Sequence, residues 1–288
     1  MEQSVVIGKK YNIIKKLGEG SFGQLYIGEN ILTKESVAIK LEDKRENAKE
    51  MLKHEAKIYR ALNGIKEIPA MRNFGNEGHF NYLIMDLLGE SLDDIKQKSG
   101  CFTITYALGI AIEMIEILEK IHERGIVHRD IKPPNFLIKT IGEKEVINII
   151  DFGLSRSYID ENYKHIPMQN TKSMVGTARY ASLNVHQGTT YSRRDDLESL
   201  GYTLIYFLKD KLPWQGIKEK NKITKYNKIY ECKKTHNAHV LCMDIPPEFE
   251  AYLDYTQTLD FSEKPNYQYL KNLFKNLQSL YNPIKTSF

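Results

Sequence analysis

The sequence lacks the features that define several large classes of protein. Its three cysteines, Cys101, Cys232 and Cys242, are odd in number and indicate no disulfide framework. No apolar run approaches the roughly 18 residues needed to cross a bilayer, and residues 1–8 show no secretory pattern. The formal net charge of +4 is too small to indicate nucleic-acid binding. We therefore expect a cytoplasmic or nuclear protein with no membrane span and no nucleic-acid partner.

The most informative stretch is residues 128–135, His-Arg-Asp-Ile-Lys-Pro-Pro-Asn. It places Asp130, Lys132 and Asn135 in one short turn, and Asp151 follows further along the chain, before Phe-Gly. Phosphoryl transfer with Mg²⁺ needs these groups: a carboxylate to orient a hydroxyl, a cation for the moving phosphate, and oxygen ligands for the metal. The pattern therefore favours phosphoryl transfer.

Two apolar segments, residues 136–139 and 146–150, separate Asn135 from Asp151 and predict a strand, a turn and a second strand. A hairpin brings its two ends together, so we expect Asn135 and Asp151 to lie close to each other and to Asp130. An amide and a carboxylate oxygen suit Mg²⁺ bound to phosphate. The alternative for Asp151 is an ordinary turn residue before a glycine.

Upstream, residues 17–23 contain the spacing Gly-x-Gly-x-x-Gly at Gly18, Gly20 and Gly23. Alone, this spacing also fits a dinucleotide site or a plain turn. The flanking residues 11–14 and 24–28 have strand character, which predicts a hairpin with the glycines at its tip. Glycine leaves backbone amides accessible to phosphate oxygens, because it has no β-carbon.

Lys40 ends the apolar run Val-Ala-Ile-Lys and needs a carboxylate partner if it is to bind phosphate. Residues 48–62 predict a helix on which Leu52, Glu55, Tyr59 and Leu62 share one face. Glu55 is thus the acidic residue within the apolar stripe, and a buried carboxylate usually has a partner. We expect that partner to be Lys40, although most glutamates on helices are simply solvated.

Together these motifs resemble the eukaryotic protein kinases, and further stretches resemble the casein kinase 1 family in particular. The family-specific stretches are residues 86–92 (Asp-Leu-Leu-Gly-Glu-Ser-Leu), 165–167 (His-Ile-Pro), 176–182 (Gly-Thr-Ala-Arg-Tyr-Ala-Ser), 192–201 (Ser-Arg-Arg-Asp-Asp-Leu-Glu-Ser-Leu-Gly) and 212–216 (Leu-Pro-Trp-Gln-Gly). The resemblance runs from about residue 11 to about residue 280.

The resemblance implies an α+β, bilobal protein-kinase fold. Residues 1–88 would form an N-lobe with an antiparallel β-sheet, one helix and the hinge, and residues 89–288 a mainly helical C-lobe. The periodicity of residues 104–123 itself predicts a core helix that Gly125 ends. The implied activity is that of a monomeric serine/threonine kinase, which transfers the γ-phosphate of ATP, with Mg²⁺, to acidic or pre-phosphorylated proteins.

The family's functional positions map onto this sequence residue by residue. Asp130 would be the catalytic base, Lys132 would contact the γ-phosphate, Thr177 would anchor Asp130, and Asp196 would bond backbone near His128. The implied catalytic residues are Asp130, Lys132, Lys40, Glu55 and Thr177. The implied ATP-binding residues are Leu17, Gly18, Gly20, Ser21, Gly23, Leu25, Ala38, Lys40, Met85, Asp86, Leu88 and Leu137. The implied metal ligands are Asn135 and Asp151. The implied substrate-phosphate site consists of Arg179, Gly216, Lys225 and Lys172.

Three alternatives remain open. A pseudokinase scaffold would bind nucleotide without turnover, although the His-Arg-Asp, Asp-Phe-Gly and Val-Ala-Ile-Lys motifs are all intact. A close relative such as a vaccinia-related or tau-tubulin kinase is less favoured by residues 192–196 and 212–216. Cys232, His236, His239 and Cys242 are spaced like zinc ligands, but the casein kinase 1 family holds no zinc at these positions.

Overall fold

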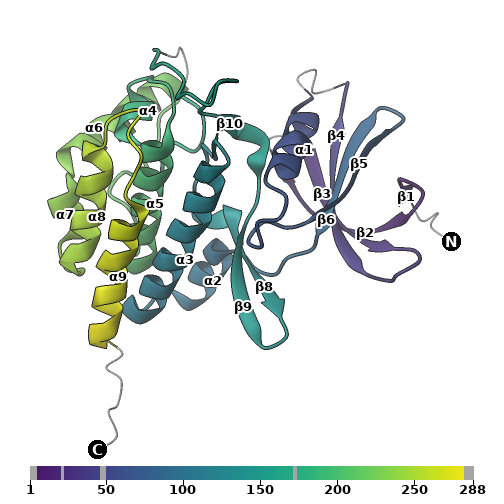
Figure 1. Cartoon of the computed structure of the whole chain (residues 1–288), viewed down its shortest axis with the longest axis horizontal. Helices are drawn as coiled ribbons and strands as arrows, with labels where there is room; N and C mark the ends of the chain where they lie inside the picture. The colour runs from purple at the N-terminus through teal and green to yellow at the C-terminus, as the bar shows by residue number, and fades with distance from the viewer. Residues whose placement is uncertain (1–4, 21–22, 46–49, 171–173, 282–288) are drawn as a thin grey trace, which may run out of the picture. The chain divides into compact units, whose positions relative to one another are not determined.

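The computed structural model describes residues 5–20, 23–45, 50–170 and 174–281. The chain divides into two compact units, Met1–Glu90 with Leu137–Gly153 and Ser91–Phe136 with Leu154–Phe288. The first unit is built on an antiparallel sheet and the second is mainly helical, which confirms the predicted fold class (Figure 1). The functional lobes at 1–88 and 89–288 remain a prediction.

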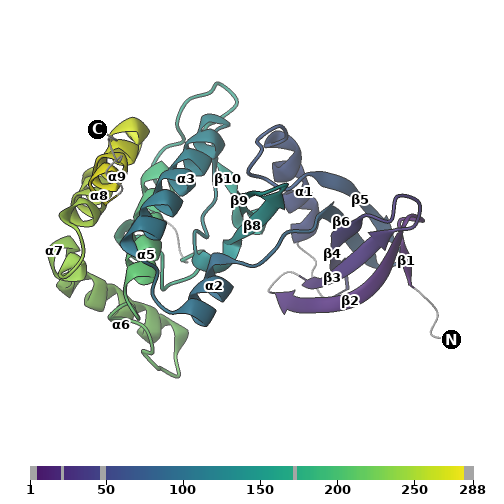
Figure 2. The ribbon, with the colours of Figure 1, turned by 90° about the horizontal axis from the view of Figure 1, so that it is seen from below.

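The first unit contains a six-stranded antiparallel sheet with the strand order β1-β2-β3-β4-β6-β5 (Figures 1 and 2). A separate two-stranded sheet pairs β8 with β9, which confirms the hairpin predicted between Asn135 and Asp151. The elements are β1 (Val6–Ile7), β2 (Tyr11–Gly20), β3 (Gly23–Asn30), β4 (Ser36–Asp43), α1 (Met51–Ala61), β5 (Met71–Glu77), β6 (Phe80–Asp86), β8 (Phe136–Ile141), β9 (Lys144–Ile149) and the short 3₁₀ helix η2 (Phe152–Leu154).

Alternation along β4 gives the six-stranded sheet an apolar face. Val37, Ile39 and Leu41 are buried in one cluster with Tyr82 and Ile84 of β6. Successive side chains of a strand point to opposite faces, so these odd-numbered residues of β4 lie on the same side. Burying a large apolar side chain contributes roughly 1.5–3 kcal/mol. The cluster therefore fixes the register of β4, and with it the face on which the even-numbered residues lie.

Helix α1 carries the predicted stripe, since Leu52, Glu55 and Tyr59 are buried, as is Leu62, which follows the last helical residue, Ala61. The sequence predicted a helix from residue 48, but the helix begins at Met51. Glu50 has φ 44°, in the left-handed region, so the right-handed helix does not extend back through it. Residues 48 and 49 lie outside the described part of the chain.

The second unit is a group of helices with two short strands. Helix α3 packs against α5 and α9, and α8 packs against α5, α7 and α9 (Figure 1). The elements are α2 (Leu92–Ser99), α3 (Ile104–Glu123), β7 (Ile126–Val127), η1 (Pro133–Asn135), β10 (Arg156–Ser157), α4 (Leu183–His186), α5 (Arg193–Leu208), α6 (Lys222–Thr235), α7 (Ala238–Cys242), α8 (Pro247–Thr258) and α9 (Tyr267–Tyr281).

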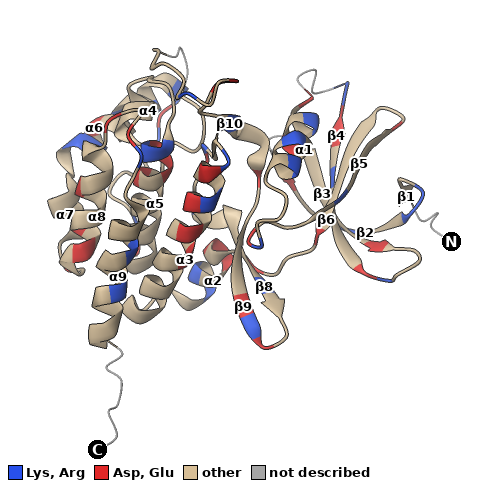
Figure 3. Ribbon diagram, in the orientation of Figure 1, with Lys and Arg blue, Asp and Glu red and all other residues tan. Residues whose placement is uncertain are grey.

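Helix α3 has the bounds that the sequence predicted. The Thr103 side chain accepts a hydrogen bond from the backbone N–H of Tyr106 at its start, and Gly125 follows its end with φ 74°. Figure 3 shows acidic bands recurring along the helix, which carries Lys120 as its only Lys or Arg. Among the residues that the structure describes, no helix is both long and apolar enough to cross a membrane.

Candidate active site

One face of the six-stranded sheet carries several residues predicted to contact the nucleotide. In the strand register Ala38 lies opposite Met85, and Lys40 lies opposite Leu25. Directly opposed residues point to the same face, as do residues two apart on one strand. Leu25, Ala38, Lys40 and Met85 therefore share the face opposite to the apolar cluster. Lys40 lies within β4, which continues to Asp43, and does not end the strand.

The glycine-rich segment forms the predicted hairpin, because β2 pairs with β3 up to Gly20 opposite Gly23. Gly23 has φ 144°, and a β-carbon there would lie 2.1 Å from the carbonyl oxygen of Leu41. Only glycine fits this close approach. A β-carbon on Gly18 would meet no atom within 4 Å, so the backbone of Gly18 borders open space. Ser21 lies outside the described residues.

Lys40 forms two ion pairs within the first unit. Its Nζ atom lies 2.7 Å from Oε2 of Glu55 and 3.2 Å from Oδ1 of Asp151. Burial on its own lowers the pKa of Lys40, but the carboxylates of Glu55 and Asp151 more than offset it and raise the pKa above its ordinary value. The ammonium thus stays charged on the sheet face, as a phosphate-binding cation must. The predicted pairing of Lys40 with Glu55 is confirmed.

Asp130 is held from two sides within the second unit. Its Oδ1 accepts hydrogen bonds from the backbone N–H of Thr177 at 2.9 Å and from the Thr177 hydroxyl at 2.8 Å. Its Oδ2 lies 2.5 Å from Nζ of Lys132, which also lies 3.3 Å from Oγ1 of Thr177. The predicted anchoring of Asp130 by Thr177 is confirmed. A carboxylate, a cation and a hydroxyl therefore converge on one point, which suits proton and phosphoryl transfer.

Asp196 supports the backbone that leads to Asp130. Its oxygens accept hydrogen bonds from the N–H groups of His128 at 2.7 Å and Arg129 at 2.9 Å, as predicted. Arg129 has φ 72°, a left-handed conformation that costs roughly 1–3 kcal/mol outside glycine. Burial acts to raise the pKa of Asp196, but the hydrogen bond and charge of His122 hold it below its ordinary value. The carboxylate thus keeps the charge that restrains the strained turn.

The two candidate metal ligands each present suitable oxygen donors. Nδ2 of Asn135 donates to the carbonyl oxygen of Asp130 at 2.9 Å, which leaves the amide oxygen as the metal-binding atom. The Asp151 side chain is 29% exposed, and the residue has φ 68°. Hard oxygen donors of these two kinds fit Mg²⁺. Asn135 and Asp151 belong to different units, so their proximity remains a prediction.

The other candidate nucleotide residues lie on strands β2 and β8 and at the end of strand β6. Leu17 is on β2, and Leu137 is on β8. The backbone N–H of Asp86 donates to the carbonyl oxygen of Ala70, and its carboxylate pairs with Arg72 and Lys139. Leu88 follows β6 and is partly buried. Their contact with adenine remains a prediction.

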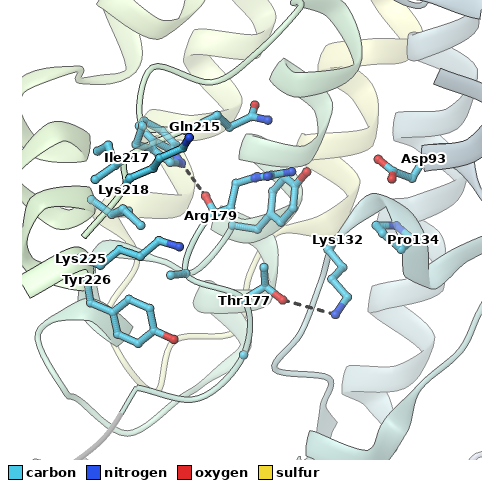
Figure 4. Close-up of a pocket in the computed structure, with 16 residues that line it drawn as sticks. Asp93, Lys132, Pro134, Thr177, Arg179, Gln215, Ile217, Lys218, Lys225 and Tyr226 are labelled. Carbon is cyan, nitrogen blue, oxygen red and sulfur yellow. Dashed lines mark hydrogen bonds between the residues drawn. The ribbon is translucent and has the colours of Figure 1, made fainter. Parts of the chain in front are cut away.

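Three of the four residues assigned to a substrate-phosphate site line one pocket of about 690 Å³ in the second unit (Figure 4). Arg179 and Lys225 lie in its wall with Gly216, and the same pocket reaches Lys132 and Thr177. Lys218 adds a further cation. Lys172 lies outside the described residues. Arg179, Gly216 and Lys225, which were grouped from the sequence, thus line one cavity, and this cavity also reaches Lys132 and Thr177 beside Asp130.

The residues spaced like zinc ligands have other contacts. Sγ of Cys232 lies 3.6 Å from Nδ1 of His236, whereas His239 pairs with Glu250. Cys242 is buried. Among the residues that the structure describes, no three His, Cys, Asp or Glu side chains are grouped as a metal site.

Sequence reasoning missed Lys233, a lysine of α6 that is only 2% exposed. Its signal is weak: it lies four residues after the buried Ile229 and so on the same helix face. It also missed Lys139, which pairs with Asp86 and follows Leu137 by two residues on β8.

Comparison with known protein families shows where the chain belongs. The sequence profile described as the protein kinase domain matches residues 11–279. The match covers nearly the whole chain, so the protein belongs to the protein kinase family. Membership implies phosphoryl transfer from ATP with a divalent metal ion, and proteins as substrates.

Proposed function

We propose that this chain is a serine/threonine protein kinase of casein kinase 1 type, which phosphorylates acidic or pre-phosphorylated proteins. The observation that carries the proposal is the pocket that joins Arg179 and Lys225 to Lys132 and Thr177. An anionic group bound by Arg179 and Lys225 lies in the same cavity as the groups around Asp130. A phosphate already present on the substrate would thereby set the position of a nearby hydroxyl.

In the proposed reaction Asp130 accepts the proton of the substrate hydroxyl, while Thr177 fixes the carboxylate. Lys132 stabilises negative charge on the γ-phosphate as it moves. Lys40, held by Glu55, binds the phosphates of ATP. Mg²⁺ bound by Asn135 and Asp151 would neutralise further phosphate charge.

The placement of family-specific stretches supports the casein kinase 1 assignment. Nε1–H of Trp214 donates to the carbonyl oxygen of Arg179 at 2.7 Å, so residues 212–216 hold residues 176–182. The resemblance implies that Ser182-Leu183-Asn184 stand where most kinases have Ala-Pro-Glu, and the Ser182 hydroxyl donates to Asp195 at 2.5 Å. Residues 176–182 and 212–216 thus both contribute to the wall of the pocket.

The assignment is tested with a pair of peptides that differ only by a phosphoserine a few residues before the target serine. We expect the wild-type enzyme to favour the phosphorylated peptide in kcat/KM. Arg179→Ala and Lys225→Ala should remove most of that preference. Lys228→Ala is the matched control, because Lys228 lies on the same helix, outside the pocket, and pairs with Glu219. Equal use of both peptides by the wild type would refute the substrate assignment.

The pseudokinase alternative gives a different result in the same assay. A scaffold would bind ATP but transfer no phosphate to either peptide. The ion pairs of Lys40 and the cluster around Asp130 support turnover, because a scaffold has no need for an anchored catalytic base.

A further inference from the structure

Lys233 is buried in a cage of acceptors beneath the pocket. Its Nζ donates hydrogen bonds to the carbonyl oxygens of Ala178, at 3.0 Å, and Ala181. The same atom lies 4.6 Å from the ring centroid of Tyr202 and 5.0 Å from that of Trp214. Two carbonyl oxygens and two aromatic faces all attract a positive charge. The cage is therefore built for an ammonium group.

The charge is costly to bury at this position. Burial lowers the pKa of Lys233 from its ordinary value, and the buried Glu198 carboxylate acts against that shift. Glu198 accepts hydrogen bonds from the backbone N–H of Leu183 and the hydroxyl of Tyr202, at 2.9 and 2.8 Å. Methionine has nearly the same length as lysine, but it would remove the donor to the carbonyl oxygens of Ala178 and Ala181. The lysine therefore ties helix α6 to these two carbonyl groups, which methionine could not do.

Three side-chain donors reach the carbonyl groups of residues 178, 179 and 181. Besides Lys233, Nε1–H of Trp214 donates to Arg179 and Nε2–H of His186 donates to Ala178, at 2.7 and 3.2 Å. Thr177, Ala178 and Arg179 of this segment line the pocket, and so does Trp214. The backbone that carries the Asp130 anchor and the candidate phosphate-binding arginine is thus fixed by side chains from outside the segment.

Helix α6 connects the two sides of the arrangement. Lys225, near its first turn, lines the pocket, and Lys233, eight residues later, holds residues 178 and 181. One rigid helix therefore sets the distance between Lys225 and the segment that bears Arg179.

We propose that Lys233 is a positioning residue for the protein substrate, which holds residues 177–181 in the conformation that binds the peptide. The inference rests on the proposed function only in that the pocket beside Thr177 receives the substrate. It concerns the backbone of the pocket wall, and does not depend on whether the bound side chain is phosphorylated or simply acidic.

The test compares Lys233→Met with Lys234→Met. Lys234 is the next residue on α6, is half exposed and pairs with Glu231, so it controls for the substitution itself. We expect Lys233→Met to raise the peptide KM about 10-fold, because both hydrogen bonds of the ammonium are lost and the segment is less firmly held, with the ATP KM unchanged. A purely structural role would lower Tm and the amount of active enzyme, but would leave the peptide KM unaltered.

Amide hydrogen exchange gives a readout that needs no activity. Lys233→Met should speed exchange in peptic fragments covering residues 177–183, and Lys234→Met should not. If Lys233→Met does not fold, Trp214→Phe removes the donor to Arg179 and should shift the same two readouts in the same direction. Unchanged peptide KM and unchanged exchange in the folded variant would overturn the inference.

The outcomes separate the inference from the proposed function. If the wild type phosphorylates both peptides equally, the substrate assignment fails, and the Lys233 comparison is made with the unphosphorylated acidic peptide. If the wild type phosphorylates neither, the proposed activity fails, and hydrogen exchange alone decides the role of Lys233.

Discussion

The hydroxyl of Thr177 donates a hydrogen bond of 2.8 Å to Oδ1 of Asp130, across 47 residues of sequence. Thr177→Val removes this donor and keeps the side-chain shape. Because a hydrogen bond to a charged group is worth roughly 1.5–3 kcal/mol, we expect kcat to fall about 10- to 100-fold. Steady-state kinetics measure the effect, with Thr177→Ser as the control that keeps the hydroxyl. Unchanged kcat in the valine variant would show that Asp130 needs no such anchor.

Lys40→Met removes the cation that pairs with Glu55 and Asp151. Turnover should fall about 100- to 1000-fold, as when one preorganised donor is lost from an active site. The variant leaves Glu55 buried without its partner, so part of any loss is due to instability. The double variant Lys40→Met/Glu55→Gln removes the unpaired charge, and should recover Tm but not activity. Recovery of both would assign Lys40 a structural role only.

Asp196→Asn tests the support of the strained turn at Arg129. An asparagine at position 196 would place its amide NH₂ group against one of the two backbone N–H groups that now donate to Asp196. We expect the free energy of unfolding, measured in urea, to fall by roughly 1.5–3 kcal/mol, and kcat to fall with it. Asp244→Asn is the control, because Asp244 is exposed and asparagine tolerates its left-handed conformation. Equal stability of the two variants would contradict the assigned role.

His186 gives the fold a predictable dependence on pH. Burial, assisted by the charge of Lys233, lowers the pKa of its imidazole from 6.5 to about 3. Between these values the unfolded state binds more protons than the folded state, so stability rises with pH and is lost as the pH falls below 6.5. The Tm of the wild type should therefore drop more between pH 7 and pH 5 than that of His186→Gln. Parallel Tm profiles would show that His186 does not contribute.

Much of the fold was predictable from local patterns. The helix at residues 104–123, the hairpin between Asn135 and Asp151, and the stripe that includes Glu55 all follow from periodicity and turn chemistry, which act over a few residues. The pairing of Lys40 with Glu55 was predictable as well, because a buried carboxylate requires a partner.

What escaped prediction depends on contacts between distant segments. Lys233 lies in a lysine-rich stretch that indicates a solvated surface, and only the carbonyl groups of residues 178 and 181 explain its burial. The start of helix α1 depends on the left-handed conformation of Glu50, which no residue pattern indicates. The first unit also takes in Leu137–Gly153, a grouping that arises from tertiary packing alone.

The most direct test of the account is transfer of radiolabelled phosphate from ATP to casein and to the phosphoserine peptide, with wild type and Asp151→Asn measured in parallel. Asp151 is both an ion-pair partner of Lys40 and a candidate Mg²⁺ ligand. We expect labelled protein and peptide with the wild type, and about 100- to 1000-fold less with a variant that folds normally by circular dichroism. Near wild-type transfer by Asp151→Asn would contradict the assigned active site.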